Sequence, residues 1–459
     1  MPDKFCILIA KLIYFFNFSI NCSNPCLEGN SEENNKYRKH IEKKQKNLNS
    51  LKQSKIKDFI NKCVYCETNK FINFVYHVLL EGKELMCTNK IYTVKEICDM
   101  YHFSYTVVEP KKKREVCIPE YFDESGEEMF WFDAPEIYVS ELEDVVITGG
   151  EDIFQIGDCI ANDLLAFDRD KRTYICTDDT FVWRKGKLYH SVIQPQKNIE
   201  KGILLIGGAS FNYYHLIVEI MSRLNYVDDL EIYDEYPVLL DAAIKNVPQY
   251  IELVHCFNIK KHELIFLDER ECVKVKKLIY PSMNTWMPVN VKHRDDSKIS
   301  DYLIAKSGLL NIRNAILKSN ISTQEKLVFI TRKKQGFVRL VNDYIVSDIF
   351  KENGFEVVDT SELTFMEQVE LFSKAKCVVG ASGAALTNIV FCRPGTIIGC
   401  IIPAESKFYA YSTIGYLLGL NNCYLNAQII CKKQHIARDI YEVDIEKCRA
   451  FINMVRETL

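Results

Sequence analysis

The chain has 459 residues, of which 47% are hydrophobic and 26% charged, and its formal net charge is −4. This length exceeds one ordinary hydrophobic core and predicts two or three domains of roughly 100–200 residues each. The low content of Gly and Pro excludes a largely disordered chain. The nearly balanced charge argues against a general nucleic-acid binder.

The 18 cysteines show no regular spacing that would indicate a disulfide framework. Cys377, Cys392 and Cys400 lie in or beside apolar runs, where a buried cysteine behaves as a small hydrophobic residue. Cys63 and Cys66 form a single CxxC pair without the second pair that a zinc site needs. We therefore expect a cytoplasmic protein with reduced thiols.

The N-terminal region is expected to be a helical and basic extension over residues 1–115. Residues 5–20 are apolar but contain Lys11, and the run is shorter than the ~20 residues of a membrane-spanning helix. It fits a signal sequence, an anchor or an interfacial helix, and we favour an interfacial or packed helix. Residues 30–60 are polar and basic, which predicts a solvated helix or tether and leaves peripheral membrane association open.

Residues 116–195 contain short β-like runs separated by Gly, Asp and Asn, which predict a meander. Residues 202–208, "GILLIGG", then predict a buried strand that ends in glycines, and residues 212–226 predict a helix. In the last third of the chain, strands are predicted at 326–332, 355–359, 377–381 and 396–402 and helices at 342–354 and 364–376, and residues 384–391 predict a short helix. Nearly continuous apolar strands that alternate with amphipathic helices indicate a parallel sheet covered on both faces.

Two groups of residues follow strands of this predicted sheet. The stretch "VVGASGAALTN" (residues 378–388) ends a strand in small residues, among them Ser382, Gly383 and Ala384, and then enters a helix. Ligands of open parallel sheets bind beyond the carboxyl ends of the strands, where a helix N-terminus attracts anions. Tight packing of the strand against the helix explains the small residues equally well.

Cations follow the strand at residues 326–332. Arg332 ends this strand, and Lys333, Lys334 and Arg339 occupy the next loop. Four cations at the edge that holds the small-residue loop suit a diphosphate, because Arg binds it bidentately and Lys adds a point charge. We expect Arg332 and Arg339 to be the principal contacts.

A third group lies on the helix predicted at residues 212–226. Asn212, His215, Glu219 and Arg223 fall within an arc of roughly 80° at 100° per residue, beside a broad apolar face. An amide, an imidazole, a carboxylate and a guanidinium on one stripe indicate either a functional site or a buried structural cluster.

The order of these motifs resembles glycosyltransferase family 61. The resemblance covers residues 116–425 and is carried by "NYYHLIVEIMSRL", "ITRKKQGFVRLVND", "GFEVVD" and "TFMEQVELFSKAKCVVGASGAALTNIVFCRPGT". That family includes bacterial capsular-polysaccharide enzymes and eukaryotic xylosyl-, arabinosyl- and N-acetylglucosaminyl-transferases. The resemblance therefore implies a hexosyl- or pentosyltransferase that moves a sugar from a nucleotide-sugar donor, a UDP-sugar, to a glycan or glycoconjugate.

The fold that the resemblance implies is α/β and GT-B-like, with two Rossmann-like domains facing a cleft. Residues 116–310 would form the acceptor-side domain, residues 311–425 the nucleotide-sugar domain, and residues 426–459 a tail that packs back. No divalent metal or other cofactor is implied. Asp168 and Asp170 form a DxD in a predicted turn, where Asp is favoured for local hydrogen bonds, and we do not interpret them as a metal site.

The resemblance also implies roles for single residues. His215 would be the catalytic base, and Glu219 would be an alternative base or would orient it; Asn212 and Arg223 would lie on the acceptor side. Donor contacts are implied for the cations and the small-residue loop named above, and further for Asn388, Glu367 and Gln368, for which helix capping and surface positions are the alternative.

Two departures from the family pattern bear on activity. Ser382 stands where the family loop Gly-x-His-Gly-Ala has His, and Leu216 stands where Trp commonly follows the helix His. Ser382 can donate a hydrogen bond but carries no charge. A catalytically weakened or inactive module that binds nucleotide sugars or glycans is therefore the alternative function. A dinucleotide-dependent redox enzyme is disfavoured because the first strand–helix turn lacks GxGxxG.

Overall fold

The computed structural model describes residues 85–88, 91–124, 126–163, 181–184, 187–191, 194–207, 209–287, 298–317, 325–332, 339–433 and 438–459. Cys87–Leu459 form one compact unit. The predictions for residues 5–20, for residues 30–60 and for Asp168 and Asp170 fall outside the described residues. Among the helices that are described, none has the length and apolar character needed to cross a bilayer.

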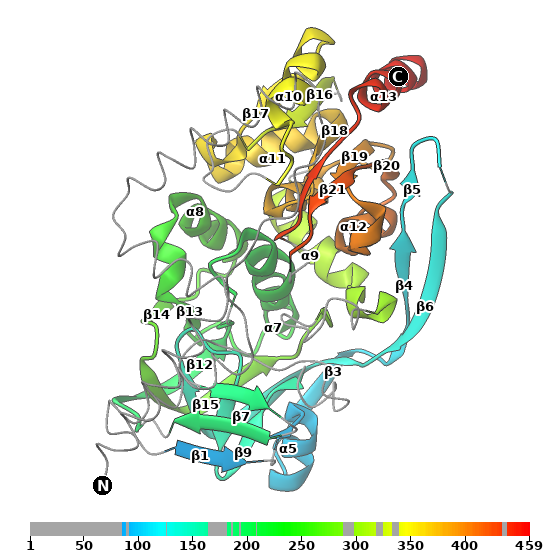
Figure 1. The fold of residues 1–459 in the computed structure, drawn as a ribbon. Coiled ribbons are helices and arrows are strands. Elements are labelled where there is room, and N and C mark those ends of the chain that lie inside the picture. The colour runs from blue at the N-terminus through cyan, green and yellow to red at the C-terminus, as the bar shows by residue number, and fades with distance from the viewer. Residues whose placement is uncertain are drawn as a thin grey trace, which may run out of the picture. The chain divides into compact units, whose positions relative to one another are not determined.

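The first half of this unit is built on a mixed sheet, which has nine strands among the described residues and the order β14-β13-β12-β15-β7-β8-β9-β2, with β3 paired to β7 (Figure 1). The strands are β2 (Ile91–Tyr92), β3 (Tyr105–Glu109), β7 (Ile137–Thr148), β8 (Phe154–Ile156), β9 (Cys159–Ala161), β12 (Lys197–Leu204), β13 (Val238–Asp241), β14 (Leu264–Leu267) and β15 (Cys272–Pro281). The neighbours β14, β13, β12 and β15 are parallel, and β7 pairs antiparallel with β15. The predicted strand at residues 202–208 corresponds to the end of β12.

The helical segments of this half include an irregular one. They are α5 (Val94–Tyr101), the π-helix η1 (His215–Ile220), the 3₁₀ turn η2 (Met221–Arg223), α7 (Leu224–Asp228), η3 (Ala242–Asn246), α8 (Pro248–Phe257), η5 (Ile299–Tyr302) and α9 (Lys306–Ile316). The single helix predicted at residues 212–226 is therefore three short segments of different winding. The apolar positions on it still face the core, since Leu216, Ile217 and Leu224 are fully buried.

The second half is built on a sheet with the order β17-β16-β18-β19-β20-β5, in which every neighbouring pair is parallel. Its strands are β5 (Glu120–Tyr121), β16 (Lys326–Ile330), β17 (Glu356–Val358), β18 (Ala375–Ala381), β19 (Ile397–Ile402) and β20 (Asn421–Asn426). Every residue of β19 is buried, as expected for a strand covered on both faces. This confirms the parallel sheet predicted from the sequence.

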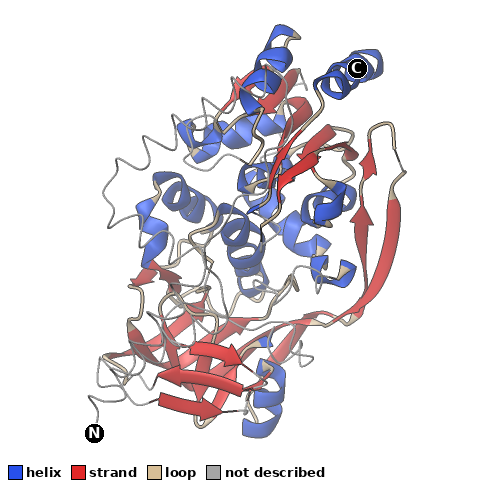
Figure 2. Ribbon diagram, viewed as in Figure 1, coloured by secondary structure: helices blue, strands red, loops and turns tan. Residues whose placement is uncertain are grey.

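Helices pack beside this parallel sheet (Figure 2). They are α10 (Asp343–Glu352), η6 (Thr360–Glu362), α11 (Phe365–Ser373), η7 (Ala384–Phe391), η8 (Ala404–Ser406), α12 (Ala410–Leu417) and α13 (Ile445–Thr458). Helix α11 begins with the predicted capping box, in which the Thr364 side chain accepts from Glu367 N and the Glu367 carboxylate accepts from Thr364 N. The predicted helix at residues 384–391 is the 3₁₀ helix η7.

A two-stranded arm from the first half lies along the second sheet (Figure 1). Strands β4 (Lys112–Ile118) and β6 (Glu128–Ala134) form its antiparallel ribbon, and β5 at its tip pairs with β20. Cys117 N donates to Thr413 Oγ1 of α12 at 3.2 Å, and the Tyr121 ring meets the Tyr424 ring edge to face. The arm therefore ties the two halves together.

The remaining strands form two smaller sheets. One has three strands, β1 (Leu85–Thr88), β11 (Lys187–Ser191) and β10 (Phe181–Arg184), and the other has two, β21 (Gln428–Cys431) and β22 (Ile440–Glu442). Helix α13 buries Cys448, Phe451 and Val455 in the core shared with β16, β18 and β19. The fold is therefore α/β with one mixed and one parallel sheet. The GT-B arrangement, the N-terminal helical extension and the proposed domain boundaries stay predictions.

Candidate functional site

The small-residue loop, Ser382 and Gly383, lies at the carboxyl edge of the parallel sheet between β18 and η7. Ser382 is 1% exposed, and its N–H donates to Ile401 O at 3.0 Å, which holds the loop to the end of β19. A Cβ at Gly380 would lie 2.9 Å from Ile330 Cβ, so the approach of β18 to β16 requires glycine there. The close packing of β18 against β16 at Gly380 therefore also sets the position of the loop at the edge of the sheet.

Two arginines converge on this loop. The Arg339 guanidinium is buried and donates to the Ser382 carbonyl, and its Nη2 lies 3.5 Å from Ser382 Oγ. On the other side, Arg332 Nη1 lies 3.0 Å from the position that a Cβ on Gly383 would occupy. Burial and then the neighbouring Arg339 charge lower the pKa of Arg332. Two cations held this close favour an anion between or beside them.

We call Arg332, Arg339, Ser382 and Gly383 the arginine cradle. Ala384 follows it as the first residue of η7, whose N-terminal N–H groups add a partial positive charge. Lys333 and Lys334, predicted beside the arginines, lie outside the described residues. The cradle can hold a phosphate or diphosphate.

Three further residues predicted to contact the sugar donor lie on η7 or α11. Asn388 on η7 is buried and donates to Gln368 Oε1 on α11 at 2.8 Å. Glu367 is exposed and caps α11, and the hydrogen bonds from the backbone and side chain of Thr364 lower the pKa of its carboxyl group. The structure therefore brings Asn388 and Gln368 together inside the protein, while Glu367 occupies the capping position.

The second group of predicted residues lies on or beside the π-helix η1. His215 Nδ1 lies 2.6 Å from Glu219 Oε2, one turn along. An ionised carboxylate can only accept, so Nδ1 carries the proton and Nε2 of the neutral imidazole is left as an acceptor. π-Helices are rare and often occur at functional sites. This winding was not predicted, because the sequence stripe was interpreted with ordinary α-helical geometry.

Burial alone lowers the pKa of His215, but the Glu219 carboxylate and, more weakly, Asp152 outweigh it, so the pKa lies above its usual value. The side chain is 16% exposed. Both residues of the His215–Glu219 pair line a cavity of about 50 Å³ at the carboxyl ends of β12 and β15. The pair can therefore accept a proton from a group that approaches the imidazole.

Arg223 lines the same cavity, whereas Asn212 does not. The Arg223 guanidinium is buried and donates to Pro281 O at 3.2 Å; burial lowers its pKa, and nearby acidic and phenolic groups oppose this shift. Asn212 Oδ1 accepts from Tyr214 N at 3.0 Å and so shapes the start of the π-helix. Arg223 Nε and Glu219 Oε1 are buried polar atoms without a hydrogen-bond partner in the described structure.

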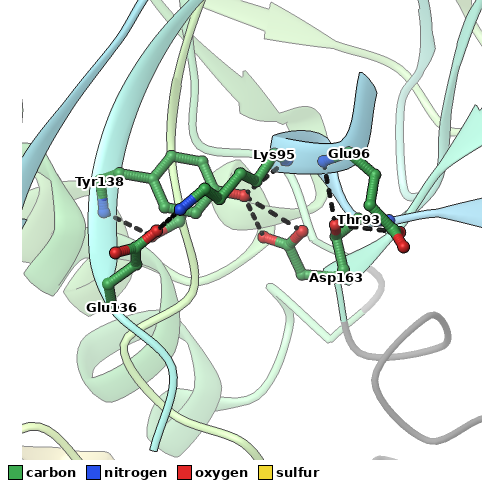
Figure 3. A network of polar contacts seen from close by, with 7 residues as sticks. Thr93, Lys95, Glu96, Glu136, Tyr138 and Asp163 are labelled. Carbon is green, nitrogen blue, oxygen red and sulfur yellow. Dashed lines mark hydrogen bonds and ion pairs between the residues drawn. The ribbon is translucent and has the colours of Figure 1, made fainter. Parts of the chain in front are cut away.

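Asp163, which sequence reasoning missed, contributes to the cavity wall. Figure 3 shows its carboxylate beside Tyr138. This carboxylate accepts from Val94 N and from Tyr280 Oη, each at 2.8 Å, and it lies 3.4 Å from Tyr138 Oη. Burial raises its pKa. Figure 3 also shows the ion pair between Lys95 and Glu136 beside Tyr138.

Asp241 was also missed. It is the last residue of the buried strand β13 and accepts from Gly150 N at 2.5 Å and from Gly207 N at 3.1 Å, which joins two loops at the cavity. Burial raises its pKa to about 6. An acidic residue at the end of the apolar run "PVLLD" was the available sequence signal. In the part of the chain that the structure describes, no cluster of His, Cys, Asp and Glu is suited to hold a metal ion.

Comparison with family models gives a match for part of the chain. Residues 213–399 match the family model described as Glycosyltransferase 61. The match begins two residues before His215, contains the whole arginine cradle and ends within β19. A comparison with curated proteins finds no match.

Proposed function

We propose that the protein is a glycosyltransferase, because residues 213–399 match the Glycosyltransferase 61 family model, and from this premise we propose the donor, the residues and the mechanism. The proposed reaction transfers a sugar from a nucleotide-sugar donor, such as a UDP-sugar, to a hydroxyl of a glycan or glycoconjugate. It inverts the anomeric configuration and needs no divalent metal. The observation that supports it most directly is the convergence of Arg332 and Arg339 on the small-residue loop.

The arginine cradle binds the diphosphate of the donor. Charge builds on the diphosphate as the bond to the anomeric carbon breaks, and fixed positive groups stabilise this charge in the transition state. Arg332 and Arg339 supply two full charges, and the N-terminus of η7 supplies a partial one. Ser382 Oγ offers a further hydrogen-bond donor. These groups would replace the charge that a metal ion provides in other transferases.

His215 acts as the base. Its Nε2 takes the proton from the acceptor hydroxyl while the oxygen forms a bond to the anomeric carbon, and the diphosphate leaves with the electron pair of the broken bond. Glu219 accepts from Nδ1–H and stabilises the imidazolium that forms, as the 2.6 Å contact allows. Asn212, just before η1, and Arg223, at the end of η2, are assigned to the acceptor side. In this proposal the two halves face each other in a GT-B-like cleft.

A non-catalytic binding module is the second candidate, because Ser382 stands where the family has a histidine. Such a module would bind the nucleotide sugar through the same cradle without transfer. The location that we propose is the cytoplasm, with peripheral membrane association through the N-terminal region. The free thiols of the described cysteines agree with a reducing compartment.

The purified protein incubated with a panel of labelled nucleotide sugars tests the function. Release of free nucleotide, even by slow hydrolysis, is expected of a transferase, whereas tight binding without release identifies the binding module. His215→Gln should lower turnover about 10²- to 10⁴-fold. His255→Gln is the matched control, because His255 is exposed on α8, and should leave turnover unchanged. Equal turnover of the two variants would refute His215 as the base.

A further inference from the structure

Tyr213, two residues before His215, reaches across to the second half of the protein. Its hydroxyl donates to Asn388 Oδ1 on η7 at 2.7 Å. Tyr213 is 7% exposed and Asn388 is fully buried, so water does not compete for this bond. The bond joins the turn that carries His215 to the helix that begins directly after Gly383.

Asn388 is held in place by its other hydrogen bonds. Its Nδ2 donates to Gln368 Oε1 at 2.8 Å and to Ala385 O at 3.1 Å. Gln368 Nε2 in turn donates to Leu363 O at 3.3 Å, before the start of α11. The Asn388 amide, which accepts the hydrogen bond from the Tyr213 hydroxyl, therefore has a fixed orientation.

The ring of Tyr213 is held from the other side. It stacks on Tyr250 of α8, with ring centroids 5.9 Å apart and an interplanar angle of 29°. Helix α8 is itself joined to α11, because the Glu252 carboxylate accepts from Phe365 N at 2.7 Å. Tyr213 is thus clamped between α8 and η7, and α8 and α11 stay joined by Glu252 whether or not the Tyr213 hydroxyl is present.

At the start of the π-helix η1, Asn212 Oδ1 accepts from Tyr214 N, and the Tyr213 hydroxyl adds a bond to the second half of the protein. The π-helix is six residues long, its N-cap Tyr214 makes no side-chain capping bond, and short helical segments have few internal hydrogen bonds to hold their ends. We propose that Tyr213 is a positioning residue that, through Asn388, holds the His215–Glu219 pair at a set place relative to the arginine cradle. The catalytic part of this inference rests on the proposed function, whereas the structural part does not.

Tyr213→Phe removes the hydroxyl and keeps the ring on Tyr250. Tyr233→Phe is the matched control: Tyr233 is buried to the same degree, and its hydroxyl donates to Glu141 Oε1 at 2.9 Å, outside the site. Both variants lose one tyrosine hydrogen bond, which is buried for Tyr213 and partly buried for Tyr233, whose acceptor Glu141 is exposed, so a general effect of losing such a bond appears in both.

The first readout is the titration of His215, followed by NMR on protein labelled at the histidine rings and assigned by its loss in His215→Gln. The charged groups that act on the pKa of this imidazole are Glu219 on its own helix and Asp152 from the loop after β7, and the Tyr214 ring meets it edge to face. The cavity that His215 lines also contains the polar residues Arg223, Glu151, Asn162, Asp163 and Tyr280. The contact with Glu219 raises the pKa of His215. If the loss of the Tyr213 hydroxyl displaces the turn and weakens this contact, His215 should titrate at lower pH. Tyr233→Phe should titrate as the wild type does.

The second readout is steady-state kinetics. Tyr213→Phe should lower kcat about 10-fold, as a displaced catalytic group does, with the donor KM within about 2-fold of the wild-type value. Asn388→Ala should lower kcat similarly, and the double variant should be no worse than Asn388→Ala alone, because both changes break the same link.

An unchanged His215 titration in Tyr213→Phe, or a kcat equal to that of Tyr233→Phe, overturns the inference. A wild-type protein without turnover on any nucleotide sugar refutes the proposed function instead. In that case the titration alone decides whether Tyr213 positions His215.

Discussion

Gly383→Ala is the smallest change that tests the arginine cradle. The added Cβ would lie 3.0 Å from Arg332 Nη1, and the next nearest atoms are Arg332 Cζ at 3.7 Å and Ala381 O at 3.8 Å. The φ of Gly383 is 173°, in the extended region that any residue adopts, so the substitution introduces no backbone strain. Crowding of the Arg332 guanidinium is therefore its main consequence.

The size of the effect follows from this geometry. Non-bonded heavy atoms prefer a separation of about 3.5 Å or more, so the guanidinium must move by about half an ångström. A hydrogen bond to a charged group is worth about 1.5–3 kcal/mol, and losing about half of it, about 0.8–1.5 kcal/mol, weakens diphosphate binding about 4- to 13-fold. The free energy of unfolding should change by less than about 0.5 kcal/mol, because the end of a flexible side chain can move at little cost.

Calorimetric titration with uridine diphosphate measures the affinity, and urea unfolding measures the stability. Gly126→Ala is the control, since a Cβ there meets nothing within 4 Å. It should bind the nucleotide as the wild type does. If Gly383→Ala also binds with wild-type affinity, the Arg332 guanidinium does not contact the diphosphate and the reasoning is wrong.

Other predictions concern pH, packing and metal. The pKa of His215 is raised above its usual value of 6.5, and the base must be neutral, so kcat in a pH–rate profile should fall at a pH above 6.5 as the solution is acidified. Glu219→Gln removes the main cause of the raised pKa and should move this fall in kcat to lower pH. The pKa of Asp241 is raised from 3.8 to about 6, so its contribution to stability is complete below pH 3.8 and is lost as the pH rises to about 6. In urea unfolding, Asp241→Asn should remove this decrease in the free energy of unfolding with pH. Gly380→Ala should lower the free energy of unfolding by about 1–3 kcal/mol, since the Cβ would overlap Ile330, and a value equal to wild type would contradict this packing. Dialysis against EDTA should leave turnover unchanged, and a loss restored by Mg²⁺ or Mn²⁺ would contradict the metal-independent mechanism.

The second sheet could be predicted from the sequence because its signals are local. The apolar runs predicted as strands at residues 326–332, 355–359 and 396–402 correspond to β16, β17 and β19, with ends that differ by one or two residues. The Thr364–Glu367 capping box was recognisable from its spacing alone. Since parallel strands end at one edge, the proximity of Arg332 and Ser382 also followed from the predicted order of elements.

Features that depend on distant pairings were not predicted. The pairing of β5 with β20 joins residues about 300 positions apart, and no local pattern encodes it. The π-winding at His215 depends on tertiary packing rather than on the hydrophobic period. Likewise, no local pattern predicts the bond between Tyr213 and Asn388, which are 175 positions apart, and the sequence indicated Asn388 only as a donor contact. The sequence could therefore indicate candidate site residues, but not the hydrogen-bond network around them.

The most direct test of the central claim is a crystal structure of the protein with uridine diphosphate bound. We expect the diphosphate oxygens to lie within about 2.7–3.2 Å of the guanidinium groups of Arg332 and Arg339, with the N–H groups at the start of η7 directed at them. A nucleotide bound elsewhere on the protein, with both guanidiniums out of reach of its phosphates, would contradict the account.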